Sequence, residues 1–268
     1  MLGEASEAED VVQDAYLRWR RSDSVTVPEA WLTKVVTNLC LNRLTSARAR
    51  REVYVGPWLP EPVFTSELGP LEIVEQRDTV SLGMLTLLER LTPPERAAFV
   101  LREAFDYSHR EIAEILDVDE AHARQLYRRA REHVGEPRKR FTPSSEQRTK
   151  IVERFLAATV EGDLAGLERL LAADVVAWAD GGGKAAAARI PVRGRERVVH
   201  LLAGLAKHPR AAAMRMSVAS VNGDPAIALH EAGALAYIIV PEIVDERIVA
   251  VRTVANPDKL AYAAGQRV

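Results

Sequence analysis

The chain has 268 residues, a length that exceeds one ordinary domain and fits two or three compact units. Hydrophobic residues make up 47% of it and charged residues 28%, a balance that excludes intrinsic disorder because such a chain can bury real cores. Acidic residues open the sequence, no apolar run approaches the roughly 20 residues that span a bilayer, and the single cysteine, Cys40, has no second thiol to pair with. We therefore expect a globular cytoplasmic protein without a disulfide framework.

The net charge of −2 conceals two basic segments. A nucleic-acid-binding protein is commonly basic overall, so the charge has to be examined locally. Two segments, 43–51 and 121–131, contain four arginines each and no acid: Arg43, Arg48, Arg50 and Arg51 in the first, and Arg124, Arg128, Arg129 and Arg131 in the second. Such clusters favour nucleic-acid contacts, although solvated helix faces have the same composition.

The sequence of residues 1–55 predicts a helical domain. Apolar residues recur at helical spacing from Val11 to Trp19, and Pro28 suits the first turn of a second helix. One face of that second helix is apolar, with Leu32, Val35, Val36 and Leu39, and another carries Lys34, Asn38 and Asn42. The first face is predicted to pack and the second to bind. Residues 56–80 begin with a stretch rich in proline and glycine and are predicted to be a linker.

The sequence of residues 81–141 predicts a helix-turn-helix domain. Capping boxes at Thr92 with Glu95 and at Ser108 with Glu111 mark helix starts, and Asp119 can cap a further helix. Ala123, Leu126, Ala130 and Val134 form the buried stripe of this last helix, and its outward side chains are His122, Arg124, Gln125, Arg128, Arg129 and Arg131. A basic second helix after a tight turn favours DNA binding over a plain helical hairpin, which has the same spacing. Arginine matches the guanine edge and glutamine the adenine edge, so we expect Arg124, Gln125 and Arg128 to read bases, and Arg129 and Arg131 to contact phosphates.

The sequence of residues 145–268 predicts an α+β domain. A helix containing Ile151 and Phe155 comes first, and a short helix then runs to about Leu171. A further helix, Gly194 to Lys207, follows the first of five strand-like runs, which are Val175 to Ala179, Met214 to Val221, Ala226 to His230, Ala234 to Val240 and Arg247 to Val254. Turn sequences at 222–225 and 244–246 join neighbouring runs, so the later strands are expected to form an antiparallel meander.

Several peptides resemble a known family. Ala8 to Trp19 resembles the polymerase-binding helix of sigma region 2, Ala30 to Arg51 its promoter-melting helix, and the segment from Leu91 through the helix-turn-helix sigma region 4. Three pentapeptides resemble those of the SigJ-type subgroup of extracytoplasmic-function sigma factors: Trp58-Leu59-Pro60-Glu61-Pro62, Asp180-Gly181-Gly182-Gly183-Lys184 and Asn256-Pro257-Asp258-Lys259-Leu260. The resemblance implies a multidomain chain in which an all-α sigma region 2, shortened at its N-terminal end, and sigma region 4 precede an α+β SnoaL-like cone with a C-terminal tail.

The function implied by this resemblance is that of a sigma factor, which is not an enzyme, needs no cofactor, and binds core RNA polymerase and promoter DNA. The polymerase would contact Asp10, Gln13 and Asp14. Melted promoter DNA would contact Trp31, Lys34, Asn38, Asn42, Arg43, Arg48, Arg50 and Arg51, and the upstream promoter element would contact the outward residues of the helix-turn-helix. The pentapeptides would let the C-terminal domain regulate the sigma regions in cis.

The pentapeptides also give a structural expectation. A large aromatic residue in a proline-rich linker has no local core, so Trp58 is predicted to anchor between domains, although a linker residue can also be exposed by chance. We expect all three peptides to meet at or near one interface and to bias the arrangement of the two DNA-reading modules. Trimming only the residues after Leu260 is expected to change activity little.

Two other functions compete with this interpretation. The first is a SnoaL-type enzyme or small-ligand receptor with a ligand in the C-terminal pocket, for which His200, His230, Asp174 and Asp180 are available, although no pair of them has a spacing that identifies an acid and a base. The segment Asp180 to Lys184 lacks the motif of a phosphate-binding loop, and a turn that needs positive φ explains its glycines more simply. The second is a one-component repressor that binds duplex DNA without polymerase.

Overall fold

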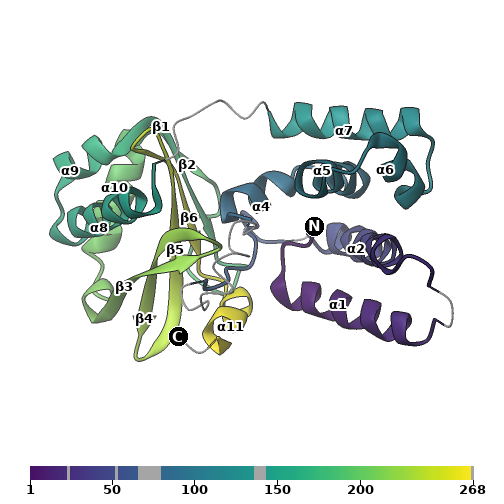
Figure 1. Ribbon diagram of the computed structural model, residues 1–268. Coiled ribbons are helices and arrows are strands. Elements are labelled where there is room, and N and C mark those ends of the chain that lie inside the picture. Colours follow the sequence, from purple (N-terminus) through teal and green to yellow (C-terminus); the bar gives the residue numbers. More distant parts are fainter. Residues whose placement is uncertain (23–24, 52–53, 66–79, 136–142, 267–268) are drawn as a thin grey trace. The chain divides into compact units, whose positions relative to one another are not determined.

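The structure is a computed structural model that describes residues 1–22, 25–51, 54–65, 80–135 and 143–266, with the backbone alone for 47–51. It divides into two compact units, Met1–Val53 with Met84–Pro137 and Tyr54–Gly83 with Arg138–Val268 (Figure 1). The helices of the first unit are α1 (Ala5–Arg20), α2 (Pro28–Arg51), α5 (Pro93–Phe105), α6 (His109–Leu116) and α7 (Glu120–Val134), while α4 (Leu82–Leu88) spans the division. No described helix is long and apolar enough to cross a membrane.

Helices α1 and α2 pack through the apolar faces that the sequence predicts. Val11 and Ala15 of α1 are 2% exposed and meet Leu39, Cys40 and Leu44 of α2. Helix α2 begins at Pro28, as expected of a residue that lacks an amide donor and suits the first helical turn.

The helix-turn-helix is confirmed. The Glu95 carboxylate accepts from the Thr92 amide at 3.0 Å at the start of α5, and Ser108 and Glu111 form the complete capping box of α6. Helix α6 ends at Asp117, whose φ of 56° is left-handed, and the Asp119 side chain accepts from the His122 amide at 2.8 Å to start α7. The stripe of α7 is buried against α5 and α6, so the basic residues remain outside.

A six-stranded sheet dominates the second unit. Its strands and helices are α8 (Ser145–Glu161), α9 (Leu164–Leu170), β1 (Leu171–Asp180), β2 (Val192–Arg193), α10 (Arg195–Ala206), η2 (Ala211–Ala213), β3 (Met214–Val221), β4 (Asp224–Glu231), β5 (Ala234–Val244), β6 (Arg247–Val254) and α11 (Pro257–Gly265). The strand order is β2-β1-β6-β5-β4-β3. Strands β3 to β6 form the expected antiparallel meander, whereas β1 pairs parallel to β6, which makes the sheet mixed.

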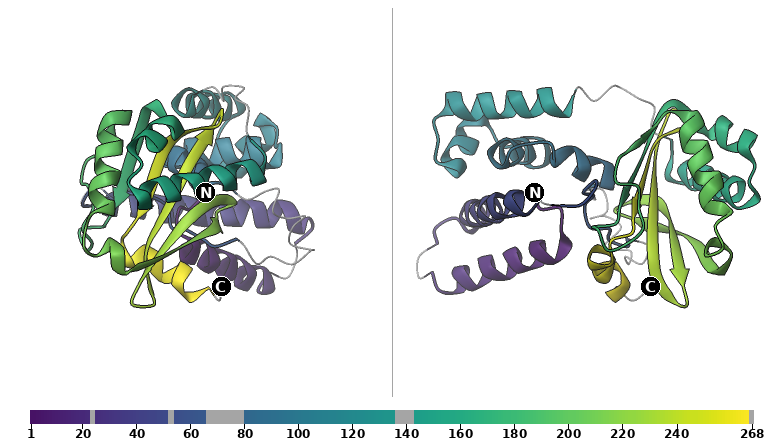
Figure 2. Two further views of the ribbon diagram at one scale, coloured as in Figure 1. Left: turned by 90° about the vertical axis from the view of Figure 1, so that its left-hand side faces the viewer. Right: turned by 180° about the vertical axis from the view of Figure 1, so that it is seen from behind.

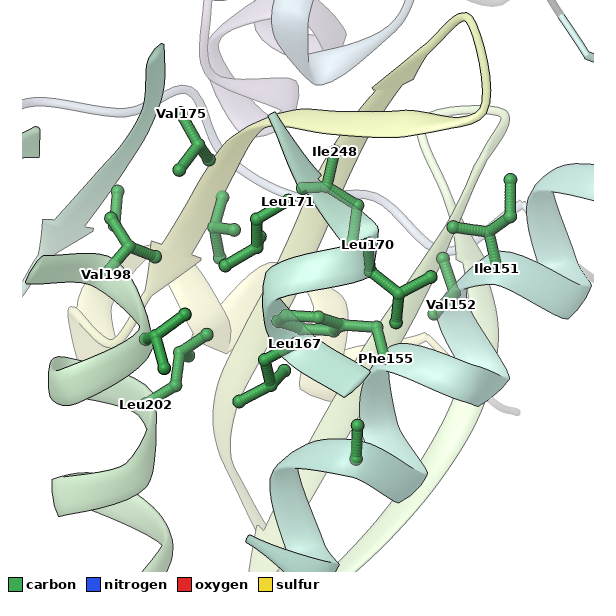
Figure 3. Packing of buried hydrophobic residues seen from close by; sticks show 14 of the residues in the cluster. Ile151, Val152, Phe155, Leu167, Leu170, Leu171, Val175, Val198, Leu202 and Ile248 are labelled. Atoms are coloured by element: carbon green, nitrogen blue, oxygen red, sulfur yellow. The ribbon is translucent and has the colours of Figure 1, made fainter. Parts of the chain in front are cut away.

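One face of the sheet carries the main core of this unit. Helices α8, α9 and α10 cover this face, and α11 lies on the opposite side of the sheet (Figures 1 and 2). Phe155 of α8, Leu167 of α9 and Val198 of α10 are at most 1% exposed and pack with Leu171, Val175 and Ile248 of the strands (Figure 3). Burial of each such side chain contributes about 1.5–3 kcal/mol to folding.

The opposite face is covered by the peptide predicted to be a linker and by α11. Leu59 and Leu82 pack with Val240 and Val254 of the sheet and with Leu260 of α11. Phe64 forms a β-bridge with Val221 at the edge of β3. Residues 56–65 of the predicted linker therefore pack as a layer of the C-terminal unit, and 66–79 lie outside the described residues.

The C-terminal tail is a helix. Asn256 caps α11 by accepting from the Asp258 amide at 3.1 Å, and Pro257 occupies the first helical position. Ala263 is fully buried, and the Gln266 side chain accepts from the Phe64 amide at 2.8 Å and donates to its carbonyl at 3.1 Å. The residues after Leu260 therefore contribute to the packing of this unit.

Candidate functional site

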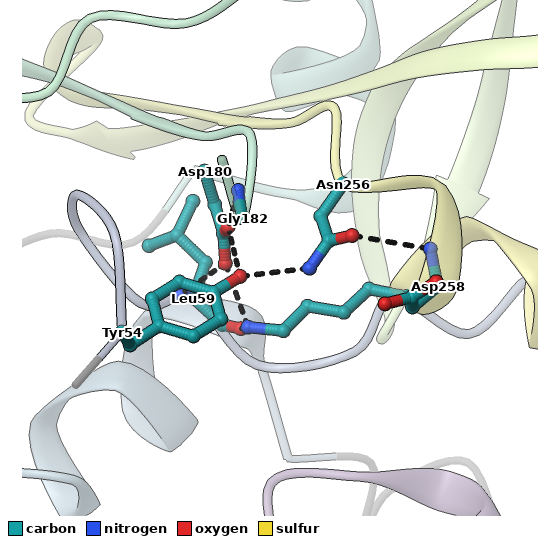
Figure 4. A network of polar contacts seen from close by, with 7 residues as sticks. Tyr54, Leu59, Asp180, Gly182, Asn256 and Asp258 are labelled. Carbon is teal, nitrogen blue, oxygen red and sulfur yellow. Dashed lines mark hydrogen bonds and ion pairs between the residues drawn. The ribbon is translucent and has the colours of Figure 1, made fainter. Parts of the chain in front are cut away.

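The three pentapeptides meet around one buried carboxylate, as predicted. Asp180, the last residue of β1, is 0% exposed, and its side chain accepts from the Leu59 amide at 2.8 Å and from the Lys259 ammonium at 2.6 Å. It also accepts from the Tyr54 hydroxyl at 2.5 Å and from the Gly182 amide at 3.1 Å (Figure 4). Four donors, one of them charged, satisfy the two oxygens and offset the cost of burying an ionised group. We call Tyr54, Trp58, Leu59, Asp180, Asn256 and Lys259 the linker clasp.

Lys259 is the second charged member of the clasp and is only 6% exposed. Besides its bond to Asp180, its ammonium donates to the Leu59 carbonyl. It lies over two aromatic rings, 3.9 Å from the centre of Trp58 and 4.9 Å from that of Tyr54. A desolvated cation–π contact contributes about 2 kcal/mol, so Trp58 helps to hold the linker within the C-terminal unit.

Asn256 is the last member of the clasp, and Gly182 lies beside it. The Asn256 amide nitrogen donates to the Tyr54 hydroxyl at 2.8 Å, while its oxygen caps α11. Gly182 has a φ of +57°, and a Cβ at this position would lie 2.3 Å from that amide nitrogen. A turn with positive φ, not a phosphate-binding loop, therefore accounts for this glycine. The remaining linker residues Pro60, Glu61 and Pro62 are buried, and Lys184 pairs with Asp258 at the exposed rim at 2.5 Å.

Sequence reasoning missed Tyr54. Burial and then the adjacent Asp180 raise the pKa of its phenol above the usual value, so the hydroxyl stays protonated and can donate. The only available signal was its position four residues before Trp58, which does not by itself distinguish Tyr54 from a surface residue.

The predicted polymerase-binding residues lie on α1. Asp10 and Gln13 are exposed and Asp14 is half-buried. The same helix exposes apolar side chains: Val12 is 65% exposed and Tyr16 50%, and with Ala8, Glu9 and Gln13 they line a shallow hollow of about 570 Å³. Asp10 and Asp14 lie 3.2 and 3.4 Å from the guanidinium of Arg43, which therefore faces α1.

The other predicted melted-DNA residues lie along α2. Lys34, Asn38 and Asn42 are exposed on one face and Trp31 is half-buried. The Lys34 ammonium donates to the Glu114 carbonyl of α6 at 3.1 Å, and the Thr33 and Tyr107 hydroxyls are 3.1 Å apart. The side chains of Arg48, Arg50 and Arg51 lie outside the described residues.

All six predicted upstream-element residues on α7 are exposed: His122, Arg124, Gln125, Arg128, Arg129 and Arg131. Arg124 pairs with Glu120 at 2.7 Å and Arg128 with Glu132 at 3.5 Å. Such exposed pairs four residues apart are weak, so both guanidinium groups are available to a stronger anion.

The residues of the enzyme alternative are dispersed. His200 and Asp174 are exposed and His230 is half-buried, whereas Asp180 belongs to the linker clasp. The described face of the sheet under α8 to α10 is filled by apolar side chains (Figure 3). The structure does not bring these four residues together as an acid–base pair.

Comparisons with known proteins give the family. Residues 1–50 match sigma-70 region 2, residues 81–134 match sigma-70 region 4, and residues 152–256 match the SnoaL-like domain. The chain is 38% identical over 273 residues to the ECF RNA polymerase sigma factor SigJ of Mycobacterium tuberculosis, covering 97% of this chain and 87% of the relative. It is 30% identical over 264 residues to a probable ECF RNA polymerase sigma factor SigI of the same species, covering 97% and 88%. The crystal structure of M. tuberculosis SigJ superposes with a TM-score of 0.78 at 35% identity, covering 99% of this chain and 93% of that one. The chain belongs to the extracytoplasmic-function RNA polymerase sigma factors and carries the SnoaL-like domain at its C-terminus.

Proposed function

We propose that this sigma factor binds polymerase, melted promoter DNA and the upstream promoter element through three separate surfaces. We further propose that the linker clasp controls the action of these surfaces. The family membership makes it a transcription initiation factor that acts with core RNA polymerase on promoter DNA, and not an enzyme. The assignment of surfaces to partners, regulation by the C-terminal domain, and action in the cytoplasm are our proposals. The observation that carries the regulatory part is that Asp180 and Lys259 bind both the amide and the carbonyl of Leu59 in the chain between the two sigma regions.

The polymerase-binding surface is the outward side of α1. Its apolar side chains, Val12 and Tyr16, are exposed to water in the free protein, which is typical of a surface that a partner covers. Gln13 lines the same hollow together with Glu9, as polar groups do at the rim of protein interfaces, whereas Asp10 and Asp14 lie beside Arg43 on another side of the helix.

Melted promoter DNA binds along α2 in this account. Lys34, Asn38 and Asn42 form an exposed polar row beside Trp31, where a single strand can find a cation, amides and an aromatic surface. Lys34 must first release the Glu114 carbonyl, an exposed hydrogen bond that phosphate can replace with a charge-assisted one.

The upstream promoter element binds along α7. Arg124, Gln125 and Arg128 are proposed to contact base edges, and Arg129 and Arg131 to contact phosphates. His122 lies exposed in the first turn of the same helix, where a recognition helix meets the groove.

The C-terminal domain regulates these surfaces through the chain that joins them. Residues 54–65 precede region 4 in the sequence and are held on the sheet of the C-terminal domain. The length of chain that is left to connect the two sigma regions therefore depends on this attachment. A ligand in the C-terminal domain is a separate expectation, and the apolar packing under α8 to α10 argues against it.

The experiment that tests the sigma function adds core RNA polymerase to the full chain and promoter DNA. We expect a protein-dependent permanganate signal from unpaired thymines only when polymerase is present. A duplex footprint that is identical with and without polymerase, and no unpaired bases, would favour the one-component repressor instead.

A further inference from the structure

A further basic site lies on the C-terminal domain, outside the two sigma regions. Strand β2 ends at Arg193, and α10 begins at Arg195 after a single glycine. Residues 193–197, with the sequence Arg-Gly-Arg-Glu-Arg, line a hollow of about 340 Å³ together with Ala173 of β1. The lining thus holds three arginines and one acid, Glu196.

The arginines of this hollow have no internal use in the described structure. Among the described residues, none of Arg193, Arg195 and Arg197 makes an ion pair, in contrast to Arg210 and Arg252 of the same domain, which pair with Glu231 and Glu242. Arg195 has a buried Nε that makes no hydrogen bond within the described part of the chain. An unpartnered buried donor is costly, and a ligand oxygen would satisfy it.

The backbone adds donors to the same hollow. Gly194 precedes α10, its φ is +91°, and it provides no side chain to cap the helix. The first helical hydrogen bond runs from the Val198 amide to the Gly194 carbonyl at 3.1 Å, so it leaves the amides of residues 195–197 outside the helical ladder. The positive end of the helix then adds to the charge of the arginines.

We propose that residues 193–197 form a binding site for a phosphate group. A phosphate offers several anionic oxygens, which suit the forked guanidinium donors of three arginines and the free amides beside them. A carboxylate has fewer acceptors to share among these donors. The phosphate comes either from the DNA backbone or from a small phosphorylated molecule, and this site is independent of the proposed roles of α1, α2, α7 and the linker clasp.

The test measures binding of pyrophosphate by isothermal titration calorimetry to the full chain. In the variant Arg193→Gln/Arg195→Gln/Arg197→Gln, which removes charge and keeps polar side chains, we expect affinity to fall about tenfold or more, because charge-assisted bonds are the strong ones. Arg215→Gln is the matched control: it removes an exposed arginine from β3 of the same domain and is expected to leave the affinity unchanged. Circular dichroism checks that each variant remains folded.

A second arm identifies the source of the phosphate with a labelled duplex that contains no promoter. If the hollow binds the DNA backbone, the triple variant weakens duplex binding, and the slope of log affinity against log salt becomes shallower by about 0.9 for each phosphate that the variant no longer neutralises. Weaker binding of pyrophosphate with unchanged duplex binding assigns the site to a small phosphorylated molecule. If the triple variant binds both probes as the wild type does, or if the wild type binds neither, the proposal is wrong.

Discussion

At the residue scale, Asp180 and Lys259 bring distant parts of the second unit together. They are 0% and 6% exposed, and each also binds the backbone of Leu59. Their charges are buried, so the stability of this unit depends on both being present.

The buried pair gives a prediction for folding. Asp180→Asn and Lys259→Met each leave an unpaired or poorly paired buried group, and we expect each to destabilise the C-terminal unit by about 3–5 kcal/mol. The double variant should cost clearly less than the sum of the two. Urea unfolding, monitored by a signal from the C-terminal unit, measures these changes in the free energy of unfolding.

A matched control for this cycle is the exposed pair Lys184–Asp258, which joins the same two pentapeptides at the surface. Lys184→Met and Asp258→Asn should change stability little, because surface ion pairs contribute little. Additive effects of Asp180→Asn and Lys259→Met would show that the two charges do not act as a pair.

The arginines of α7 give a second prediction at this scale. Arg124→Ala or Arg128→Ala should weaken binding to the cognate upstream element by about 1–3 kcal/mol and relax the preference at one position. Arg129→Ala should weaken all sequences alike and reduce the salt dependence. Binding measured against a set of single-base variants separates the two classes, and the reverse assignment would show that α7 enters the groove with another face.

At the element scale, the sequence predicted most helices and strands because their signals are local. Capping at Ser108 and Asp119 located the helix-turn-helix, and turn residues located the hairpins. The parallel pairing of β1 with β6 was missed because it joins residues about 75 positions apart and leaves no local pattern. Helix α11 was missed because its nine residues begin within a peptide that was interpreted as part of a tail, although Asn256 and Pro257 are a helix-start signal.

The sequence predicted that the three pentapeptides meet at the candidate site, but it did not predict the hydrogen bonds that hold them there. The three pentapeptides indicated proximity through their resemblance to a family, whereas the donors around Asp180 depend on the tertiary fold. The Leu59 amide and the Tyr54 hydroxyl carry no sequence signal for this role.

Helix α1 gives a prediction about the polymerase. Val12→Glu/Tyr16→Ser places polar groups in the exposed apolar patch and should weaken binding to core polymerase, because in the proposed function the polymerase covers this patch. Leu205→Ser on α10 is the control, since Leu205 is 56% exposed and lies in the other unit. Co-purification with core polymerase measures the difference, and equal recovery of both variants would place the polymerase surface elsewhere.

Helix α11 gives a prediction about the C-terminus. A chain that ends at Leu260 lacks the buried Ala263 and the hydrogen bonds between Gln266 and Phe64, so residues 63–65 should become less protected. Hydrogen exchange at the Phe64 and Thr65 amides should rise in this chain relative to the wild type. Unchanged protection would show that α11 does not hold this part of the linker.

At the scale of the whole molecule, one chain carries two sigma regions and a domain that binds the peptide between them. A tethered domain has an effective concentration of about millimolar, so even modest contacts persist. The proposed regulation in cis would then require no second protein, and the linker clasp would be the attachment through which it acts.

The most direct test is promoter-dependent run-off transcription by core polymerase with the full chain, Trp58→Ala and Lys259→Met. The account predicts a transcript that requires the wild-type chain and whose amount changes several-fold in both variants, while binding of the isolated upstream duplex stays the same. Equal transcript from all three proteins would contradict control by the linker clasp, and no transcript from any of them, despite duplex binding, would contradict the sigma function itself.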